Sequence, residues 1–327
     1  MLAYQIYGAF LALGCLASSL ISSPQSHEPF VTVTPGTIAQ FPLGTWVENI
    51  AVRRNGHLLV TLVSAPEIYQ IVPFNSSSSS SSTHLAFSFD GHSNVTGITE
   101  VQTDVFAVCV DGKYLWKLQF SEGSNPQASL ITMIPEAQLL NGMATLNSAQ
   151  GIVIIADSIR GCIWRVDINT GAYELILEDE TMQPEPVLDL ILGINGLKMV
   201  GNTAYYTNTP KRLFCRVQLD PVSGRATSPI DIITDTVEAD DFAISSTGIA
   251  YLATIYQNEI TRVLSQGETQ VIAGSLNSSS IPNPTSGAFG RTLMDRNVLY
   301  VTTGGGAATP INGTFVEGGA VISFRAR

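Results

Sequence analysis

Asn195-Gly196-Leu197-Lys198-Met199 opens the unit that decides the fold of this chain. A second strand-like segment, Ala204-Tyr205-Tyr206-Thr207, and a third, Leu213-Phe214-Cys215-Arg216-Val217, follow it after short turns. The second segment is aromatic, which favours β-strand. The same order, a polar or small residue followed by three hydrophobic segments, occurs six times and opens at Glu48, Gly97, Asn141, Asn195, Asp240 and Ser286.

The openings are 44 to 54 residues apart, which is the length of one four-stranded blade of a β-propeller. No long segment has the apolar period of a helix. The sequence therefore predicts an all-β, six-bladed propeller that forms a single domain over residues 24–327. An N-terminal strand, expected at Phe30-Val31-Thr32-Val33, should close the last blade beside Ala320 to Phe324 and cover its edge.

Residues 1–23 predict a secretory signal peptide, because an apolar run from Ile6 to Leu20 precedes Ser22-Ser23-Pro24. The run lacks a basic residue before it, so a buried first strand or a membrane anchor is the alternative, although the run is short for a membrane span. Four Asn-X-Ser/Thr triplets agree with the secretory pathway and predict glycosylation at Asn75, Asn94, Asn277 and Asn312.

Three cysteines remain once Cys15 leaves with the signal peptide. Cys109, Cys162 and Cys215 cannot all pair within one chain because their number is odd. A bridge between Cys109 and Cys162 and a set of ordinary buried thiols both stay open.

The net charge is −11, with 16 basic and 27 acidic residues. This balance disfavours a nucleic acid or an anionic membrane as partner. The chain is 45% hydrophobic and only 13% charged, which fits a large buried core. We expect small apolar molecules as partners, and we take a monomer as the default because the sequence does not specify an oligomer.

The innermost strands of a propeller line its axis, so residues at their starts converge. Glu48, Asn141, Asn195 and Asp240 should therefore meet at one central mouth. Two carboxylates and two amide oxygens suit a hard cation such as Ca²⁺ or Mg²⁺, and Asp240 or Glu48 is a candidate base. The structural alternative is that these residues only cap strand ends and satisfy turns.

Four segments give the chain a resemblance to the gluconolactonase/senescence-marker-protein family of six-bladed propellers, in its secreted fungal form. They are Trp46-Val47-Glu48-Asn49, Asn195-Gly196-Leu197 with Tyr205-Tyr206, Asp240-Asp241-Phe242-Ala243-Ile244, and Phe289-Gly290-Arg291. The resemblance implies that Glu48, Asn195 and Asp240 are ligands of Ca²⁺ or another divalent cation. It also implies that Asn141 faces the substrate and that Asp240 is a hydrolytic base.

One departure from the family concerns Leu139, which stands where the sugar-lactone hydrolases carry an arginine. An apolar wall suits a poorly soluble substrate better than a sugar. The secreted fungal branch includes hetero-Diels-Alderases of meroterpenoid pathways, which join a quinone methide to a polyene such as humulene, and this resemblance implies such an activity. The cycloaddition requires no cofactor.

An apolar cavity with hydrogen-bond donors would suit that reaction. The candidate catalytic or polar contacts are Asp240, Asn141, Asn195 and Arg291, and the candidate walls are Trp46, Leu139, Tyr205, Phe242 and Phe289. For each aromatic residue, ordinary packing within a blade is the alternative.

Two other functions remain as alternatives: a metal-dependent lactonase or esterase using the same oxygen ligands, and a non-enzymatic small-molecule-binding propeller. No Ser-His-Asp arrangement is apparent, since the four histidines, His27, His57, His84 and His92, lie in the first third of the chain away from the repeat openings. No nicotinamide or flavin fingerprint is present. The exact substrates and the stereochemistry are beyond what the sequence specifies.

Overall fold

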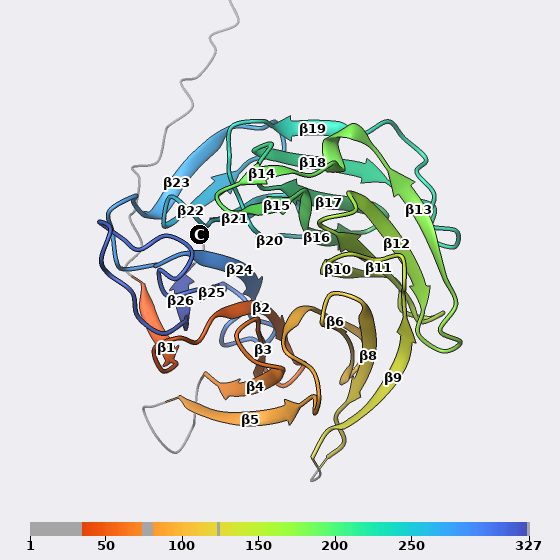
Figure 1. The fold of residues 1–327 in the computed structure, drawn as a ribbon, viewed down its shortest axis with the longest axis horizontal. Helices are drawn as coiled ribbons and strands as arrows, with labels where there is room; N and C mark the ends of the chain where they lie inside the picture. The colour runs from red at the N-terminus through yellow and green to blue at the C-terminus, as the bar shows by residue number, and fades with distance from the viewer. Residues whose placement is uncertain (1–34, 74–80, 123–124, 326–327) are drawn as a thin grey trace, which may run out of the picture. The chain divides into compact units, whose positions relative to one another are not determined.

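Six four-stranded antiparallel sheets surround a central axis in this computed structural model, which describes residues 35–73, 81–122 and 125–325 (Figure 1). In five of the sheets the strands step outward in sequence order, so the first strand of each lies nearest the axis. This arrangement confirms the predicted all-β, six-bladed propeller.

The strands are grouped by blade. Blade 1 contains β2 (Val47–Val52), β3 (Leu58–Leu62), β4 (Glu67–Val72) and β5 (Ser82–Ser88). Blade 2 contains β6 (Val95–Gln102), β7 (Val105–Val110), β8 (Tyr114–Gln119) and β9 (Gln127–Met133). Blade 3 contains β10 (Leu140–Asn147), β11 (Ile152–Asp157), β12 (Cys162–Asp167) and β13 (Tyr173–Glu178).

The remaining blades follow the same plan. Blade 4 contains β16 (Ile194–Val200), β17 (Thr203–Asn208), β18 (Leu213–Gln218) and β19 (Asp231–Thr234). Blade 5 contains β20 (Phe242–Ile244), β21 (Ala250–Thr254), β22 (Glu259–Val263) and β23 (Thr269–Gly274). Blade 6 contains β24 (Pro284–Phe289), β25 (Val298–Thr303), β26 (Ala320–Arg325) and β1 (Gly36–Gln40). Between blades 3 and 4 lie a short 3₁₀ helix, η1 (Glu180–Met182), and a hairpin, β14 (Glu185–Val187) and β15 (Leu190–Leu192).

The ring closes where the N-terminal strand β1 pairs with β26, and Figure 1 shows the orange β1 beside the blue β26. The antiparallel register runs from Gly36 opposite Ser323 to Gln40 opposite Ala320. The predicted closure of the last blade by an N-terminal strand is therefore confirmed, with Gly36–Gln40 as the strand. The segment Phe30–Val33 named from the sequence lies outside the described residues, as do residues 1–23 and Cys15.

Buried apolar clusters join neighbouring blades. Leu59 of β3 packs with Phe106 of β7 between blades 1 and 2, and Ile154 of β11 packs with Tyr206 of β17 between blades 3 and 4. Burying one such side chain contributes roughly 1.5–3 kcal/mol. The face-to-face packing of the sheets thus holds the ring together.

A bulge interrupts the innermost strand at the same point in most blades. The register shifts between Val47 and Asn49 in β2, between Leu140 and Met143 in β10, and between Ile194 and Leu197 in β16. A bulge re-aims the side chains next to it. The polar residues at the repeat openings lie at these bulges.

A repeated threonine contact ties each bulge to the next blade. The Thr207 hydroxyl accepts from the Gly196 amide (2.9 Å) and donates to the Asp240 carbonyl (2.5 Å). The Thr61 hydroxyl accepts from the Asn49 amide (3.0 Å) and donates to the Thr96 carbonyl (2.7 Å). Thr96 is therefore the structural counterpart of Asp240.

Two of the repeat openings named from the sequence were therefore one residue late. Thr96, not Gly97, opens blade 2. Thr302 accepts from the Ser286 amide (3.1 Å) and donates to the Glu48 carbonyl (3.4 Å), so Ser286 corresponds to Asn49, and Thr285 opens blade 6. Gly97 and Ser286 each directly follow the true opening residue. Because the bulge cannot be seen in the sequence, these small residues resemble the first residue of a repeat.

Glycines follow the openings in adjacent blades because the innermost strands approach closely there. A Cβ on Gly142 would lie 2.3 Å from the Asn195 carbonyl oxygen, and one on Gly196 would lie 2.3 Å from Asp241 Oδ1. Real Cβ atoms do not approach other atoms so closely. These glycines allow the openings of blades 3 to 5 to gather around one point.

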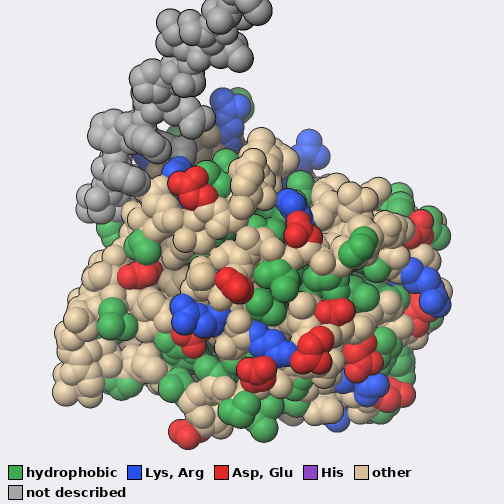
Figure 2. Space-filling model, turned by 90° about the horizontal axis from the view of Figure 1, so that it is seen from above, with side chains coloured by type: hydrophobic (Ala, Val, Ile, Leu, Met, Phe, Trp, Pro, Cys, Tyr) green, Lys and Arg blue, Asp and Glu red, His purple; other side chains and the backbone are tan. Residues whose placement is uncertain are grey.

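Cys109, Cys162 and Cys215 are buried free thiols, so the open choice between a bridge and thiols is decided in favour of thiols. Burial, with a further contribution from Asp157, raises the pKa of Cys162 to about 12. On the side of the ring seen in Figure 2, acidic and basic side chains are interspersed. Within the described ranges, no helix has the length and apolar character needed to cross a bilayer.

Candidate active site at the central mouth

A cavity of about 460 Å³ opens at the end of the axis where the innermost strands begin. Glu48, Asn141, Asn195 and Asp240 all line it, from blades 1, 3, 4 and 5. All four are buried. The structure thus brings together the four oxygen-bearing residues for which the repeat predicted a common location.

Asn195 links its neighbours on the floor of this cavity. Its side-chain oxygen accepts from Asn141 Nδ2 (2.6 Å), and its Nδ2 donates to Asp240 Oδ1 (2.6 Å) and to the Thr209 hydroxyl (3.0 Å). A continuous hydrogen-bonded row therefore runs from blade 3 to blade 5 and fixes the orientation of the amides.

Glu48 lies opposite this row and accepts a hydrogen bond from Trp46 Nε1 (2.6 Å). The pKa of Glu48 is raised to about 7 as the net result of three effects: burial raises it most, the Trp46 hydrogen bond lowers it, and the negative charge of Asp241 raises it. The carboxyl group therefore changes its protonation near neutral pH.

Asp240 has a pKa well above its ordinary value. Burial is the main cause, and repulsion by Glu48 and Asp241 adds to it, whereas the hydrogen bond from Asn195 and the charge of Lys198 oppose the rise. Among the described residues, neither Glu48 nor Asp240 forms an ion pair with a basic side chain. Two buried carboxyl groups in this situation hold protons or require a bound cation.

The walls of the cavity are apolar. Trp46 and Leu139, both predicted as wall residues, line it. Val63, Ile255 and Ala308 add apolar surface, and so do leucines of the β14–β15 hairpin. The cavity therefore combines a polar floor with apolar sides.

Tyr256 lines the same cavity and was missed by the sequence analysis. Burial, with repulsion by Asp240 and Glu238, raises its pKa to about 12, so its hydroxyl stays protonated. No hydrogen bond from this hydroxyl is found among the described residues. The second strand of each blade ends where the first strand begins, so residues just after a second strand lie at the mouth. Tyr256 follows β21 in this way, as Thr209 follows β17, and this position is the signal that could have identified it.

Four candidate site residues lie elsewhere. Tyr205 stacks on Phe214 in the core between blades 4 and 5, with ring centroids 6.0 Å apart. Phe242 and Phe289 line a different cavity, of about 380 Å³, formed by the far ends of the innermost strands. Arg291 is near that end too, since it donates to the Val52 carbonyl (2.9 Å) and pairs with Glu100. Each strand residue advances roughly 3.3 Å, so residues a few positions beyond an opening lie deeper along the axis.

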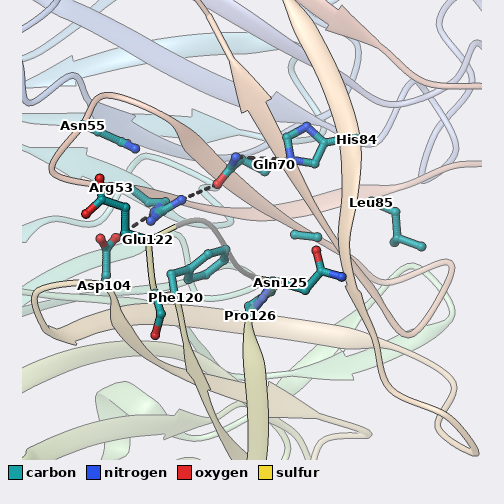
Figure 3. Close-up of a pocket in the computed structure, with 12 residues that line it drawn as sticks. Arg53, Asn55, Gln70, His84, Leu85, Asp104, Phe120, Glu122, Asn125 and Pro126 are labelled. Carbon is teal, nitrogen blue, oxygen red and sulfur yellow. Dashed lines mark hydrogen bonds and ion pairs between the residues drawn. The ribbon is translucent and has the colours of Figure 1, made fainter.

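Another cleft, of about 600 Å³, lies between blades 1 and 2 (Figure 3). There Arg53 pairs with Asp104 (2.7 Å), donates to Gln70 (2.6 Å), and lies 4.2 Å from the ring centre of Phe120. Because the charge of Arg53 is already neutralised by Asp104 and this cleft does not contain the converging residues of the repeat openings, it is a weaker candidate. We therefore assign the candidate site to the central mouth.

The metal-ligand role of Glu48, Asn195 and Asp240 stays a prediction. Within the described part of the chain no group of three His, Cys, Asp or Glu side chains is arranged to hold a metal. Two carboxylates with neighbouring amide oxygens still fit a hard cation, because the buried carboxylates lack a cationic partner.

Of the predicted glycosylation sites, Asn277 and Asn312 are exposed, Asn94 is partly buried and lines the central cavity, and Asn75 lies outside the described residues. A glycan on Asn94 would crowd the mouth, whereas one on Asn277 or Asn312 would project into solvent. Occupancy of all four sites stays a prediction.

Comparison with known proteins reveals two relatives in sequence. A protein of Sarocladium schorii, provisionally named a hetero-Diels-Alderase, is 29% identical over 81% of this chain and 77% of its own length. A Phoma protein with the same provisional name is 29% identical over 84% of this chain and 91% of its own. No family model matches the chain.

Solved structures agree on the fold. The calcium-binding protein regucalcin from Agrobacterium tumefaciens has a TM-score of 0.63 at 15% identity and covers 91% of this chain and 96% of its own. A luciferin-regenerating enzyme scores 0.65 at 16% identity, with coverage of 90% and 95%. A protein provisionally described as a gluconolactonase scores 0.61 at 12% identity, with coverage of 90% and 92%. The chain therefore shares the six-bladed propeller fold of these structures and is similar in sequence to two proteins provisionally named hetero-Diels-Alderases, in agreement with the resemblance seen in its sequence.

Proposed function

We propose that this protein is a pericyclase of natural-product biosynthesis that joins a quinone methide to a humulene-type polyene by a hetero-Diels–Alder reaction. The C=C–C=O unit of the quinone methide adds across one alkene, so one C–C and one C–O bond form while three π bonds become one. No atom leaves and no electron acceptor is needed. The names of the two relatives in sequence support this reaction class.

The observation that carries the proposal is the combination of a polar floor and apolar walls in one cavity of about 460 Å³. That volume falls within the range of roughly 300–1,000 Å³ that is typical of small-molecule sites. Such a cavity can hold a carbonyl-bearing partner against its polar groups and a hydrocarbon against its walls. Holding both in a reactive geometry replaces an improbable encounter in solution, which is the main source of acceleration for a cycloaddition.

Tyr256 and Asn141 are the polar groups that we assign to the quinone methide carbonyl. A hydrogen bond to this oxygen draws electron density from the heterodiene and stabilises the charge that develops in the transition state. The Tyr256 hydroxyl is free to donate, and its raised pKa keeps the proton in place. Asn141 Nδ2 faces the same cavity but already donates to Asn195, so Tyr256 is the stronger candidate.

The test is chiral chromatography with mass detection on the protein incubated with a quinone-methide precursor and humulene, beside a protein-free control. We expect one enriched stereoisomer, and we expect Tyr256→Phe to lower its rate of formation by about tenfold or more. Tyr173→Phe, on the outer strand β13, is the matched control. A racemate formed at the protein-free rate would reject the proposal.

A metal-dependent lactone hydrolase is the second candidate, and the buried carboxylates of Glu48 and Asp240 favour it. With Asn195 they would hold a divalent cation, which would supply a positive charge to polarise a lactone carbonyl. The side chain of Asp240 would then take a proton from water. Lactone hydrolysis that survives both a chelator and Asp240→Asn would exclude this candidate.

A non-enzymatic binding propeller is the third candidate, and we keep it as the outcome in which neither reaction is accelerated. We further propose that the chain enters the secretory pathway, on the evidence of residues 1–23 and the glycosylation triplets alone. Mass spectrometry of the secreted protein would test this by locating its N-terminus and any glycans.

A further inference from the structure

The longest interval between two repeat openings, from Asn141 to Asn195, contains a 3₁₀ helix and a two-stranded hairpin, elements that are not found between any other two blades in the described residues. These elements, η1 and the β14–β15 hairpin, form a segment between the last strand of blade 3 and the first of blade 4. In the view of Figure 1 the hairpin overlaps blade 4. The function proposed above does not yet assign it a role.

The base of this segment is firmly anchored. Met182 is fully buried, and Gly193 packs so tightly that a Cβ there would lie 2.3 Å from the Met182 carbonyl oxygen. Asn208 Nδ2 donates to the carbonyls of Thr181 (2.9 Å) and Gln183 (3.1 Å). The hairpin therefore leaves the ring as a fixed arm.

The tip of the arm, by contrast, is apolar and exposed. Leu188 is 61% exposed, Leu190 56% and Ile191 57%. Leu188 also has a φ of +51° at the first position of the two-residue turn, where glycine, asparagine or aspartate is usual. An unfavourable backbone conformation combined with an exposed leucine side chain is typical of a site kept for function.

Leu188, Leu190 and Leu192 line the central cavity together with Asn195 and Asp240. Leu190 and Leu192 are two residues apart on one strand, so their side chains share a face. Asp189, between the first two leucines, is the charged residue that the turn adds to the lining. The arm thus places an apolar row opposite the polar floor of one cavity.

We propose that these three leucines form the subsite for the hydrocarbon partner of the cycloaddition, an unsaturated terpene skeleton without hydrogen-bonding groups. The inference rests on the proposed function and specifies how its two substrates are separated. The polar floor takes the carbonyl-bearing partner, because buried donors and acceptors need polar groups. The leucine row takes the partner that gains most from leaving water.

The experiment measures hydrocarbon binding separately from the reaction. Ligand-observed NMR would give the affinity of the full chain for humulene, with no quinone methide present, for the wild type and for Leu188→Gly. Removing a leucine side chain that packs on the ligand should weaken binding by about tenfold. Leu188→Gly should keep or raise thermal stability, because glycine adopts the positive φ freely.

Leu190→Ser is the second variant, and Leu293→Gly, which alters an 86% exposed leucine on the loop between β24 and β25, is the matched control. Unchanged humulene affinity in both hairpin variants would overturn the hairpin assignment even if the cycloaddition proceeds. Weakened binding without any accelerated cycloaddition would retain the hydrocarbon subsite and reject the proposed reaction.

Discussion

Two adjacent carboxylates on the central axis, Asp240 at the open mouth and Asp241 one residue deeper, have opposite surroundings. Asp241, toward the far end, accepts from Lys198 Nζ (2.6 Å), Ser286 Oγ (2.8 Å) and Asn49 Nδ2 (3.1 Å). Asp240, at the open mouth, accepts from Asn195 and has no basic side chain paired with it. Burial is similar for both residues, so the difference lies in their partners.

This contrast separates a structural carboxylate from a candidate functional one. A buried charge with a complete set of partners ties blades together, whereas a buried charge without a counter-charge is costly unless a ligand, proton or cation compensates it. Far-end variants should therefore change stability, and mouth variants should change activity or the response to pH.

The largest effect is expected for Lys198→Met. This change leaves the Asp241 carboxylate buried without a cationic partner, which should lower the free energy of unfolding by roughly 3–5 kcal/mol. Urea denaturation at pH 7 measures the loss. Adding Asp241→Asn should restore much of it, and a loss in the single variant below about 1 kcal/mol would contradict the structural role of the pair.

The pH dependence of stability should reveal Glu48. An unfolded glutamate ionises near its ordinary pKa of 4.5, whereas folded Glu48 keeps its proton until about pH 7. Between these values the unfolded state releases a proton that the folded state retains, so the free energy of unfolding falls as pH rises, by an amount on the order of 3 kcal/mol. Below pH 4.5 this contribution of Glu48 is fully present.

Glu48→Gln should remove that part of the pH dependence and gain stability relative to the wild type at pH 8. Denaturation curves at pH 5 and pH 8 give the comparison, with Glu178→Gln, exposed on β13, as the control. Parallel curves for the wild type and Glu48→Gln would show that the mouth carboxyl is not strained by burial.

A smaller effect is expected for Thr207→Val, which removes the hydroxyl between the Gly196 amide and the Asp240 carbonyl. Leaving these buried groups without their partner should cost about 1–3 kcal/mol. Because the same contact holds the backbone of Asp240, the rate of product formation should also fall. A variant of normal stability and normal rate would indicate that the inter-blade threonines are dispensable.

The smallest effect is expected for Arg291→Gln. The arginine is 43% exposed and its pair with Glu100 lies at the far end, so the change should alter stability by no more than about 1 kcal/mol. Product formation should match the wild type. A large loss of rate would show that Arg291 contributes to catalysis, as the sequence predicted. It would also contradict the distinction between a functional mouth and a structural far end.

Several features of the fold were predictable from the chain alone. The number of blades can be counted from the recurrence of polar openings and aromatic second strands. Each blade buries both faces of its sheet against its neighbours, so the same residue pattern recurs in every blade. The location of Glu48, Asn141, Asn195 and Asp240 followed from their equivalent positions in the repeat. The one-residue errors at Gly97 and Ser286 arose because a bulge shifts the register of the first strand by one residue, and no characteristic residue type identifies the bulge in the sequence.

Other features depended on the assembled ring. Phe289 and Arg291 come only a few residues after an opening, yet they lie toward the far end of the axis, away from the mouth. Each strand residue advances the chain along the axis, so a few residues are enough to separate them from the mouth. Tyr256 and the leucine arm come from turns, whose direction is set by how the blades pack. The raised pKa of Glu48 has the same origin, since burial and the nearby Asp241 charge exist only after folding. The sequence by itself therefore determined the blades and the polar openings, because repeated local patterns specify strands, whereas tertiary structure decided which groups share a cavity and which charges remain without a partner.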